Sequence, residues 1–217
     1  MTRASEQALQ GIRDPSTMQW YAIPLLAIVL YIYSREIVEA RRLKDWSALH
    51  AGLTLFGMDF VNETVNGWIL NLSHRSALWT APGPTALRVF VGWNLEIIFM
   101  FALGGIVFFH TLSREPGARI LGLPDRWFWA IAYSAFCVLV EQWLNLGGLL
   151  VWEYPFWNRS FSGVWLIFLF GYFHFYVATI LVLRMESHRR RAIAIGAIYA
   201  VAIVGNVIGF GVLGFRY

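Results

Sequence analysis

The chain is built from long apolar runs separated by short basic loops. A helix of about 20 apolar residues is long enough to cross the hydrocarbon core of a bilayer. We predict six such helices, and the count falls to five if the first one lies in the membrane interface. The predicted fold is an all-α, polytopic membrane helix bundle. The predicted ranges are 18–34, 47–70, 88–110, 127–151, 163–183 and 192–214.

Composition supports a membrane protein with one domain. The 217 residues are 58% hydrophobic and only 14% charged, whereas about a quarter of a soluble domain is charged. No linker rich in Pro, Gly or Ser divides the chain, so we predict a single integral-membrane domain at 1–217 with an interfacial tail at 1–17. The basic residues lie at helix ends, so we expect no nucleic-acid partner.

The distribution of Lys and Arg predicts how the helices are oriented. The loops after the first, third and fifth predicted helices hold more of these residues than the remaining loops and termini. Cytoplasmic loops of membrane proteins carry such an excess. We therefore predict a multi-pass protein with cytoplasmic basic loops and non-cytoplasmic termini. Pro24 is expected to kink the first helix.

The second predicted helix carries a polar face inside its apolar run. In the stretch GMDFVNETVNGWILN (57–71), helical spacing puts Asp59, Asn62, Glu63 and Asn66 on one face. An ionised carboxylate at mid-bilayer depth costs about 3 kcal/mol or more, so such residues face a protein interior or a wet cavity. We interpret this face as one wall of an intramembrane pocket.

Polar residues of other helices are expected at the same depth. With alternating helix directions, they fall on one level displaced toward the non-cytoplasmic side. The fourth predicted helix repeats the pattern, with Ser134, Cys137, Glu141 and Asn145 on one face. Because these polar residues are expected at one depth, we predict a pocket shared by several helices. The residues placed at this level are Glu63, Asn66, Glu96, Glu141, Asn145, Glu153 and Asn206.

The clustered carboxyl groups predict acid–base chemistry. Apolar burial favours the protonated form of a carboxyl group, and a protonated carboxyl is a proton donor. We assign Glu63 as the acid, with Asp59 tuning its protonation. Glu96 and Glu141 stabilise positive charge or take the proton back, and His174 relays the proton or only hydrogen-bonds a carboxylate. The predicted substrate-binding residues are Asn62, Asn66, Trp93, Asn145, Trp152, Glu153, Tyr172, Tyr176 and Asn206.

No cofactor or metal is expected. The chain lacks HExxH, has a single cysteine, Cys137, and has no nucleotide-binding fingerprint. A metal held by the carboxyl groups and His174, or a haem bridging His50 and His110, stays open as an alternative. Other features are interpreted as structural. The GxxxG of Gly205 and Gly209 predicts close helix packing, and Trp and Tyr residues such as Trp79, Trp152 and Trp157 predict interfacial belts.

The order of polar features over about residues 50–183 resembles the sterol Δ8–Δ7 isomerase (emopamil-binding protein) family. It is also similar to the small membrane-bound terpene cyclases. The resemblance rests on Glu63, on Glu96 in GWNLEIIFMFALGG, and on Glu141, as successive acids on successive helices. It implies that a buried carboxylic acid protonates an alkene or epoxide and that a second group removes a proton from the resulting carbocation.

The predicted function is therefore a membrane-embedded isomerase or cyclase for a lipophilic isoprenoid or sterol-like substrate. Its partners are that substrate and the lipid bilayer, and its cavity is expected to measure several hundred Å³ and to open to lipid. Aromatic faces lining the site would stabilise a cation. Two other classes fit the same residues. They are a proton-coupled transporter, which also uses midplane acids, and a non-catalytic lipid-binding subunit, in which the acids pair off and leave no cavity.

Overall fold

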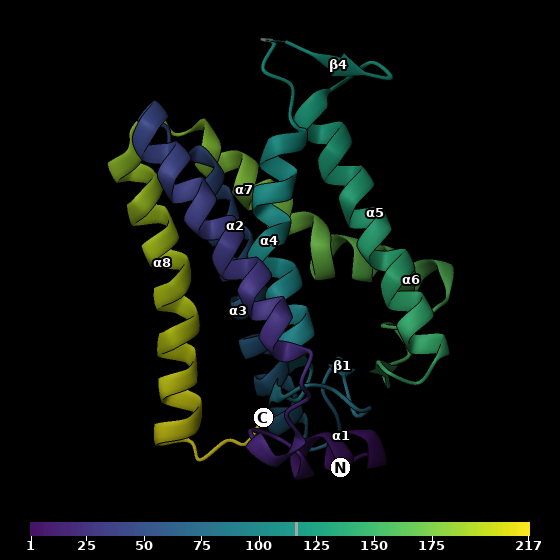
Figure 1. Cartoon of the computed structure of the whole chain (residues 1–217). Helices are drawn as coiled ribbons and strands as arrows, with labels where there is room; N and C mark the ends of the chain where they lie inside the picture. The colour runs from purple at the N-terminus through teal and green to yellow at the C-terminus, as the bar shows by residue number, and fades with distance from the viewer. Residues whose placement is uncertain (116) are drawn as a thin grey trace.

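The computed structural model describes residues 1–115 and 117–217. Its long helices run up and down a bundle, with both termini at one end (Figure 1). The helices are α1 Arg3–Gln10, α2 Ala22–Leu43, α3 Ser47–Ser73, α4 Leu95–Thr111, α5 Asp125–Leu146, α6 Phe161–Ile167, α7 His174–Arg184 and α8 His188–Asn206, with a 3₁₀ turn η1 at Pro15–Thr17. The π-helical turn η2 (Phe168–Phe173) joins α6 to α7, and η3 (Val207–Val212) extends α8.

Within the described residues, six short strands form three antiparallel pairs at the two ends of the bundle. At the terminal end, β1 (Trp79–Thr80) pairs with β6 (Val151–Trp152), and β2 (Arg88–Phe90) pairs with β3 (Trp93–Asn94). At the other end, β4 (Arg119–Ile120) and β5 (Leu123–Pro124) form a hairpin. The β1–β6 pair joins the loop after α3 to the loop after α5.

The all-α prediction is confirmed for the long elements, but six membrane spans are not established. In the part of the chain that the structure describes, three segments are long and apolar enough to cross a membrane: Asp125–Leu146, Phe161–Arg184 and His188–Val212. The apolar helix α4 has only 17 residues. Among the described residues, α2 and α3 have sufficient length but carry many polar side chains.

Three predicted helix boundaries were wrong. The first helix runs over 22–43, so Pro24 lies in its first turn, where the missing N–H costs no intrahelical bond and no kink is needed. Residues 88–94 form the β2–β3 hairpin, and α4 begins after Asn94, whose side chain caps it by accepting the Ile97 N–H. The helix at 127–151 ends at Leu146, because Gly148 adopts a left-handed conformation with φ +71°.

The N-terminal residues include a short helix that packs on one end of the bundle. Helix α1 packs against the terminal-end strands, with Ser5 and Ala8 fully buried. The Thr2 backbone N–H donates to the Arg75 carbonyl at 2.9 Å. The N-terminal segment therefore forms part of the cap that covers this end of the bundle.

Helix α3 lies at the centre of the bundle and packs against α4, α7 and α8. A Cβ added at Gly105 of α4 would collide with the Ala51 carbonyl of α3, so the two backbones are in direct contact. On the opposite side, a Cβ at Gly205 of α8 would lie 3.0 Å from Thr64 of α3. The close packing predicted from GxxxG is confirmed, and both faces of α3 are held by close neighbours.

A buried arginine holds the terminal-end cap together. The Arg88 side chain is buried and donates to the carbonyl oxygens of Ala81 (2.7 Å), Gly83 (2.7 Å) and Ala8 (3.3 Å). Burial lowers the pKa of this guanidinium, which still remains cationic. One side chain thus links α1, the loop after β1 and the β2–β3 hairpin.

We predict that Arg88→Met destabilises the cap and the whole protein. The substitution keeps much of the side-chain volume but leaves three buried carbonyl oxygens without a donor, at a cost of about 3 kcal/mol. Thermal unfolding of the detergent-solubilised protein measures the loss. Arg41→Met, at an exposed position of α2, is the control. Equal melting temperatures for the two variants would contradict the structural role of Arg88.

Candidate functional site

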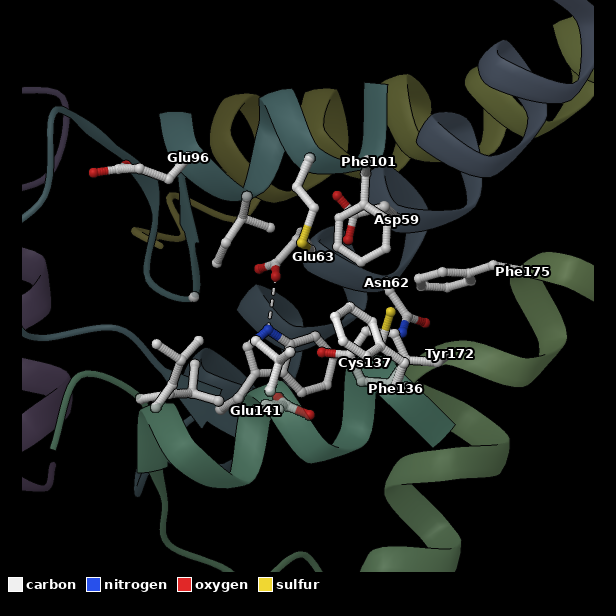
Figure 2. Close-up of a pocket in the computed structure, with 18 of the residues that line it drawn as sticks. Asp59, Asn62, Glu63, Glu96, Phe101, Phe136, Cys137, Glu141, Tyr172 and Phe175 are labelled. Carbon is white, nitrogen blue, oxygen red and sulfur yellow. Dashed lines mark hydrogen bonds between the residues drawn. The ribbon is translucent and has the colours of Figure 1, made fainter. Parts of the chain in front are cut away.

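A cavity of about 200 Å³ lies between α3, α4, α5 and η2. Its walls are mostly apolar and aromatic, and its polar groups are few and concentrated (Figure 2). Met100 of α4 and Phe136 of α5 line it and are also exposed on the surface, so the cavity opens between these helices. The volume is smaller than the several hundred Å³ expected from the sequence. Its lining includes Asp59, Asn62, Glu63, Trp79, Gly92, Glu96, Met100, Phe101, Phe136, Cys137, Glu141, Trp157, Tyr172 and Phe175.

Two acids of α3 project toward this cavity one helical turn apart. Asp59 is 4% exposed and accepts a hydrogen bond from the Trp93 indole Nε1 at 2.7 Å. Glu63 is 3% exposed, and its Oε1 accepts from the Trp79 Nε1 at 2.7 Å. Each carboxyl group thus has one indole donor. Of the polar face predicted for this stretch, Asp59, Asn62 and Glu63 line the cavity, whereas Asn66 does not.

The third acid, Glu141, reaches the cavity from α5 and is 7% exposed. Figure 2 shows Glu63 and Glu141 projecting from different helices toward the same space. The side chains of Tyr172 and Trp152 approach the Glu141 carboxyl group. Cys137, one turn earlier on the same face of α5, also lines the cavity. The predicted juxtaposition of α3 and α5 acids is therefore present.

Several buried polar atoms around the cavity lack a hydrogen-bond partner among the described residues. The Oε2 atoms of both Glu63 and Glu141 are unpaired acceptors, or donors when protonated. The indole Nε1 atoms of Trp152 and Trp157 are unpaired donors. Buried polar groups usually have a hydrogen-bond partner, so each of these atoms calls for an explanation such as a catalytic role, a bound water or an ion. One oxygen of Glu63 and one of Glu141 are therefore open to a further hydrogen bond.

The indole that binds Glu63 is held in place by two neighbours. The Asn66 side chain accepts from the backbone N–H groups of Leu78 (2.8 Å) and Trp79 (3.3 Å) and donates to the Trp79 carbonyl at 2.8 Å. A Cβ at Gly92 would collide with the Trp79 ring and lie 2.7 Å from Asn66 Nδ2. Asn66 is thus a positioning residue that acts through Trp79 rather than a cavity-lining residue.

The assignment of Trp79 and Trp157 to an interfacial belt was wrong. Both are buried, and their rings stack with centroids 5.7 Å apart beside Glu63. Sequence reasoning missed them because aromatic residues near helix ends are typical of membrane interfaces. The β1–β6 pairing places Trp79 opposite Trp152. This pairing joins two loops, so it has no periodic pattern in the sequence that could have predicted it.

Glu96 lines the cavity, but its carboxylate points away from the other acids (Figure 2). It accepts hydrogen bonds from the Tyr21 hydroxyl (2.6 Å), the Thr85 hydroxyl (2.5 Å) and the Ala86 N–H (2.9 Å). The hydrogen bond to this carboxylate raises the pKa of Tyr21 to about 12. Glu96 therefore links α4 to the loops before α2 and β2. The depth predicted for Glu96 did not indicate this structural role.

Asn62 and His174 bind the backbone of the π-helical turn. Asn62 donates from Nδ2 to the Phe170 carbonyl at 2.9 Å, and His174 Nδ1 lies 3.1 Å from the Leu169 carbonyl. These bonds hold η2 in the shape that brings Gly171 and Tyr172 to the cavity. His174 is not among the cavity-lining residues. Its imidazole contacts the backbone, whereas a proton relay or a hydrogen bond to a carboxylate was expected.

The remaining predicted residues lie outside the cavity lining. Asn145 donates to the Leu150 carbonyl at the end of α5, and Glu153 binds Thr2 and Arg75 in the cap. Asn206 bonds to Thr64 on the α8 side of α3. The polar residues that were predicted to share one depth therefore lie in three places: the cavity, the cap and the α3–α8 interface. Three further predicted residues contact a lining residue without lining the cavity themselves. They are Trp93 beside Asp59, Trp152 beside Glu141 and Tyr176 beside Cys137.

The possible metal and haem ligands have other surroundings. Within 1–115 and 117–217, no group of three or more His, Cys, Asp and Glu side chains has a metal-binding arrangement. His50 stacks on His188 with ring centroids 5.6 Å apart. His110 contacts Glu36 at 2.9 Å. The geometry at these histidines therefore favours structural contacts.

We predict that Gly92→Ala disturbs the Trp79–Glu63 hydrogen bond. The added methyl group would push against the indole and Asn66, and overpacking of this kind costs about 2 kcal/mol. Thermal unfolding in detergent measures the effect. Gly196→Ala is the control, because a Cβ there meets nothing within 4 Å. A Gly92→Ala protein as stable as the control would show that Trp79 can move freely.

Comparisons with known proteins give a family but no activity. A family model described as an uncharacterized membrane protein family matches residues 2–211. An "Uncharacterized protein" of Archaeoglobus fulgidus is 39% identical over 212 residues, which is 98% of each chain. No solved structure matches the chain. The chain thus belongs to this uncharacterized membrane protein family.

Proposed function

We propose that this protein is a membrane-embedded isomerase or cyclase that acts on a lipophilic isoprenoid or sterol-like substrate. The observation that carries the proposal is the apolar cavity bordered by three buried carboxyl groups, two of which have an unpaired oxygen. Acid-catalysed isomerisation or cyclisation of an alkene needs a proton donor at one position of the substrate and a proton acceptor at another. The cavity presents such groups from α3 and α5.

The residues have distinct roles in this proposal. Glu63 donates a proton to an alkene carbon, or to an epoxide oxygen whose C–O bond then breaks, and the Trp79 indole orients the Glu63 carboxyl group. Glu141 accepts the proton released from the neighbouring carbon, and the substrate leaves with no change in redox state. Asp59 lies one helical turn before Glu63 and also lines the cavity, and in this proposal its charge state tunes the acid. Glu96 and His174 hold the scaffold and take no part in the proton transfer.

Aromatic side chains support a cationic intermediate. Trp79 and Trp157 form one stacked pair beside Glu63, and Phe101 and Tyr172 form another with centroids 6.1 Å apart. The negative face of an aromatic ring attracts a cation. The ionised acceptor carboxylate adds a second favourable interaction. The lining thus provides what a short-lived carbocation needs while excluding water.

The cavity size limits how the substrate binds. Pockets for drug-sized ligands measure roughly 300–1,000 Å³, and about 200 Å³ encloses only part of such a molecule. In this proposal the reacting end enters the cavity, and the remaining hydrocarbon passes between Met100 and Phe136. A substrate entering sideways from the bilayer would take this path. The proposed arrangement has six spans, cytoplasmic basic loops and non-cytoplasmic termini.

Deuterium incorporation tests the proton transfer even while the substrate is unidentified. Lipids that co-purify with the protein are extracted and identified by mass spectrometry, then returned to the protein in D₂O. Wild-type turnover should add one deuterium to the product. Glu63→Gln should lower the incorporation rate by roughly 10²- to 10⁴-fold, the usual contribution of a general acid.

The matched control for this test is Glu186→Gln, because Glu186 is exposed outside the helices. Equal helix content in the two variants establishes that both are folded. Full deuterium incorporation by Glu63→Gln would refute the assignment of the acid. Proton-dependent flux across proteoliposomes without any change in the lipid would identify a carrier instead.

Filling the cavity should remove the bound lipid. Val140 of α5 lines the cavity, whereas the adjacent Leu139 is 55% exposed and does not. Val140→Trp should therefore reduce the co-purifying lipid several-fold, and Leu139→Trp should leave it unchanged. Mass spectrometry of extracted lipid, normalised to protein, makes the comparison. Equal lipid content in the two variants would place the binding site elsewhere.

A further inference from the structure

A second hollow lies at the end of the bundle opposite the termini. It measures about 380 Å³ and is formed where α3 begins, α4 ends, α5 begins and α7 ends. Phe109, Leu112, Ile180 and Leu183 form its apolar part. Its polar lining residues are Ser47, His110, Ser113, Arg114, Asp125 and Arg126. The hollow is separate from the acid-lined cavity and shares no lining residue with it.

Most polar groups of this hollow already have partners. Asp125 is buried and accepts the Ser113 N–H at 2.8 Å, and Ser47 accepts from the Arg191 guanidinium at 2.7 Å. Two side chains remain, Arg114 and Arg126. Both are exposed, and neither makes a side-chain hydrogen bond or an ion pair with the described residues. Together they outweigh the single Asp125 charge, so the hollow has a net positive charge.

The β4–β5 hairpin beside the hollow exposes apolar side chains on the protein surface. It projects beyond the ends of α4 and α5 (Figure 1). Leu121 at its tip is 89% exposed, and Leu123 is 44% exposed. Arg119 lies on the same hairpin. Apolar side chains next to arginines are typical of protein surfaces that bind the interface of anionic membranes.

We propose that this hollow binds the phosphate-bearing headgroup of an anionic phospholipid. The phosphate lies between Arg114 and Arg126, whose guanidinium groups suit the geometry of phosphate oxygens. The acyl chain lies along Phe109, Leu112 and Leu183, which a soluble phosphate compound would leave uncovered. The hairpin inserts Leu121 into the same interface. This site is independent of the proposed catalytic function, because it uses no residue of the acid-lined cavity.

Native mass spectrometry of the full chain tests the site. The protein is solubilised in detergent and titrated with phosphatidylglycerol or with zwitterionic phosphatidylcholine. We expect one phosphatidylglycerol molecule to be retained per chain in preference to phosphatidylcholine. Arg114→Gln combined with Arg126→Gln should weaken that retention roughly tenfold or more, given the usual effect of two arginines on anionic lipid binding.

The matched control is Arg189→Gln combined with Arg190→Gln, which removes the same charge from exposed positions at the start of α8. This control should bind phosphatidylglycerol like the wild type. An equal loss in both double variants would refute a defined site and indicate general charge attraction. Equal retention of the two lipids would refute recognition of an anionic headgroup. Displacement of phosphatidylglycerol by millimolar inorganic phosphate would identify a soluble phosphate ligand and overturn the lipid assignment.

Discussion

The hydrogen bond from the Trp79 indole to Glu63 is the interaction on which the candidate site depends. It places a donor against a carboxyl group that would otherwise be buried without a partner in an apolar interior. Trp79 can reach Glu63 only because Asn66 fixes its backbone and Gly92 leaves room for its ring. The bond uses one oxygen of the carboxyl group, and the other oxygen has no hydrogen-bond donor among the residues that the structure describes. One side chain thus combines a structural hydrogen bond with the open oxygen that the proposed proton transfer would use.

Helical spacing was sufficient to predict the polar wall of the cavity. Asp59 and Glu63 share a face of α3, and Cys137 and Glu141 share a face of α5, because a period of 3.6 residues fixes both alignments. The long helices themselves follow from apolar runs, and the tight contact at Gly205 follows from the GxxxG pattern. These features could be predicted because each depends on residues that are close together in the sequence.

The features that escaped prediction depend on contacts between distant loops. Depth matching placed Glu96 with the other acids, but its carboxylate binds Tyr21 and Thr85, which come from two separate loops. The π-helical turn that brings Tyr172 to the cavity is held by Asn62, more than 100 residues earlier, and no propensity rule marks its position. The irregular cap at 88–94 was likewise hidden, because Arg88 resembles a helix-end cation in the sequence. The family match establishes a membrane protein, and neither it nor the archaeal relative gives evidence for the expected resemblance to sterol isomerases.

The order in which the cavity residues emerge during synthesis has a consequence for assembly. Glu63 meets its indole partner only 16 residues later in the chain, and Asp59 meets Trp93 after 34 residues. Both α3 acids can therefore acquire donors once α3 and the β2–β3 hairpin have been made. The opposite wall requires α5, and the strand that pairs with β1 follows α5. In a nascent chain that ends before α5, these contacts would form one wall of the cavity, and both carboxyl groups would already have an indole donor. The early helices would then avoid burying unpaired carboxyl groups before the second wall is made.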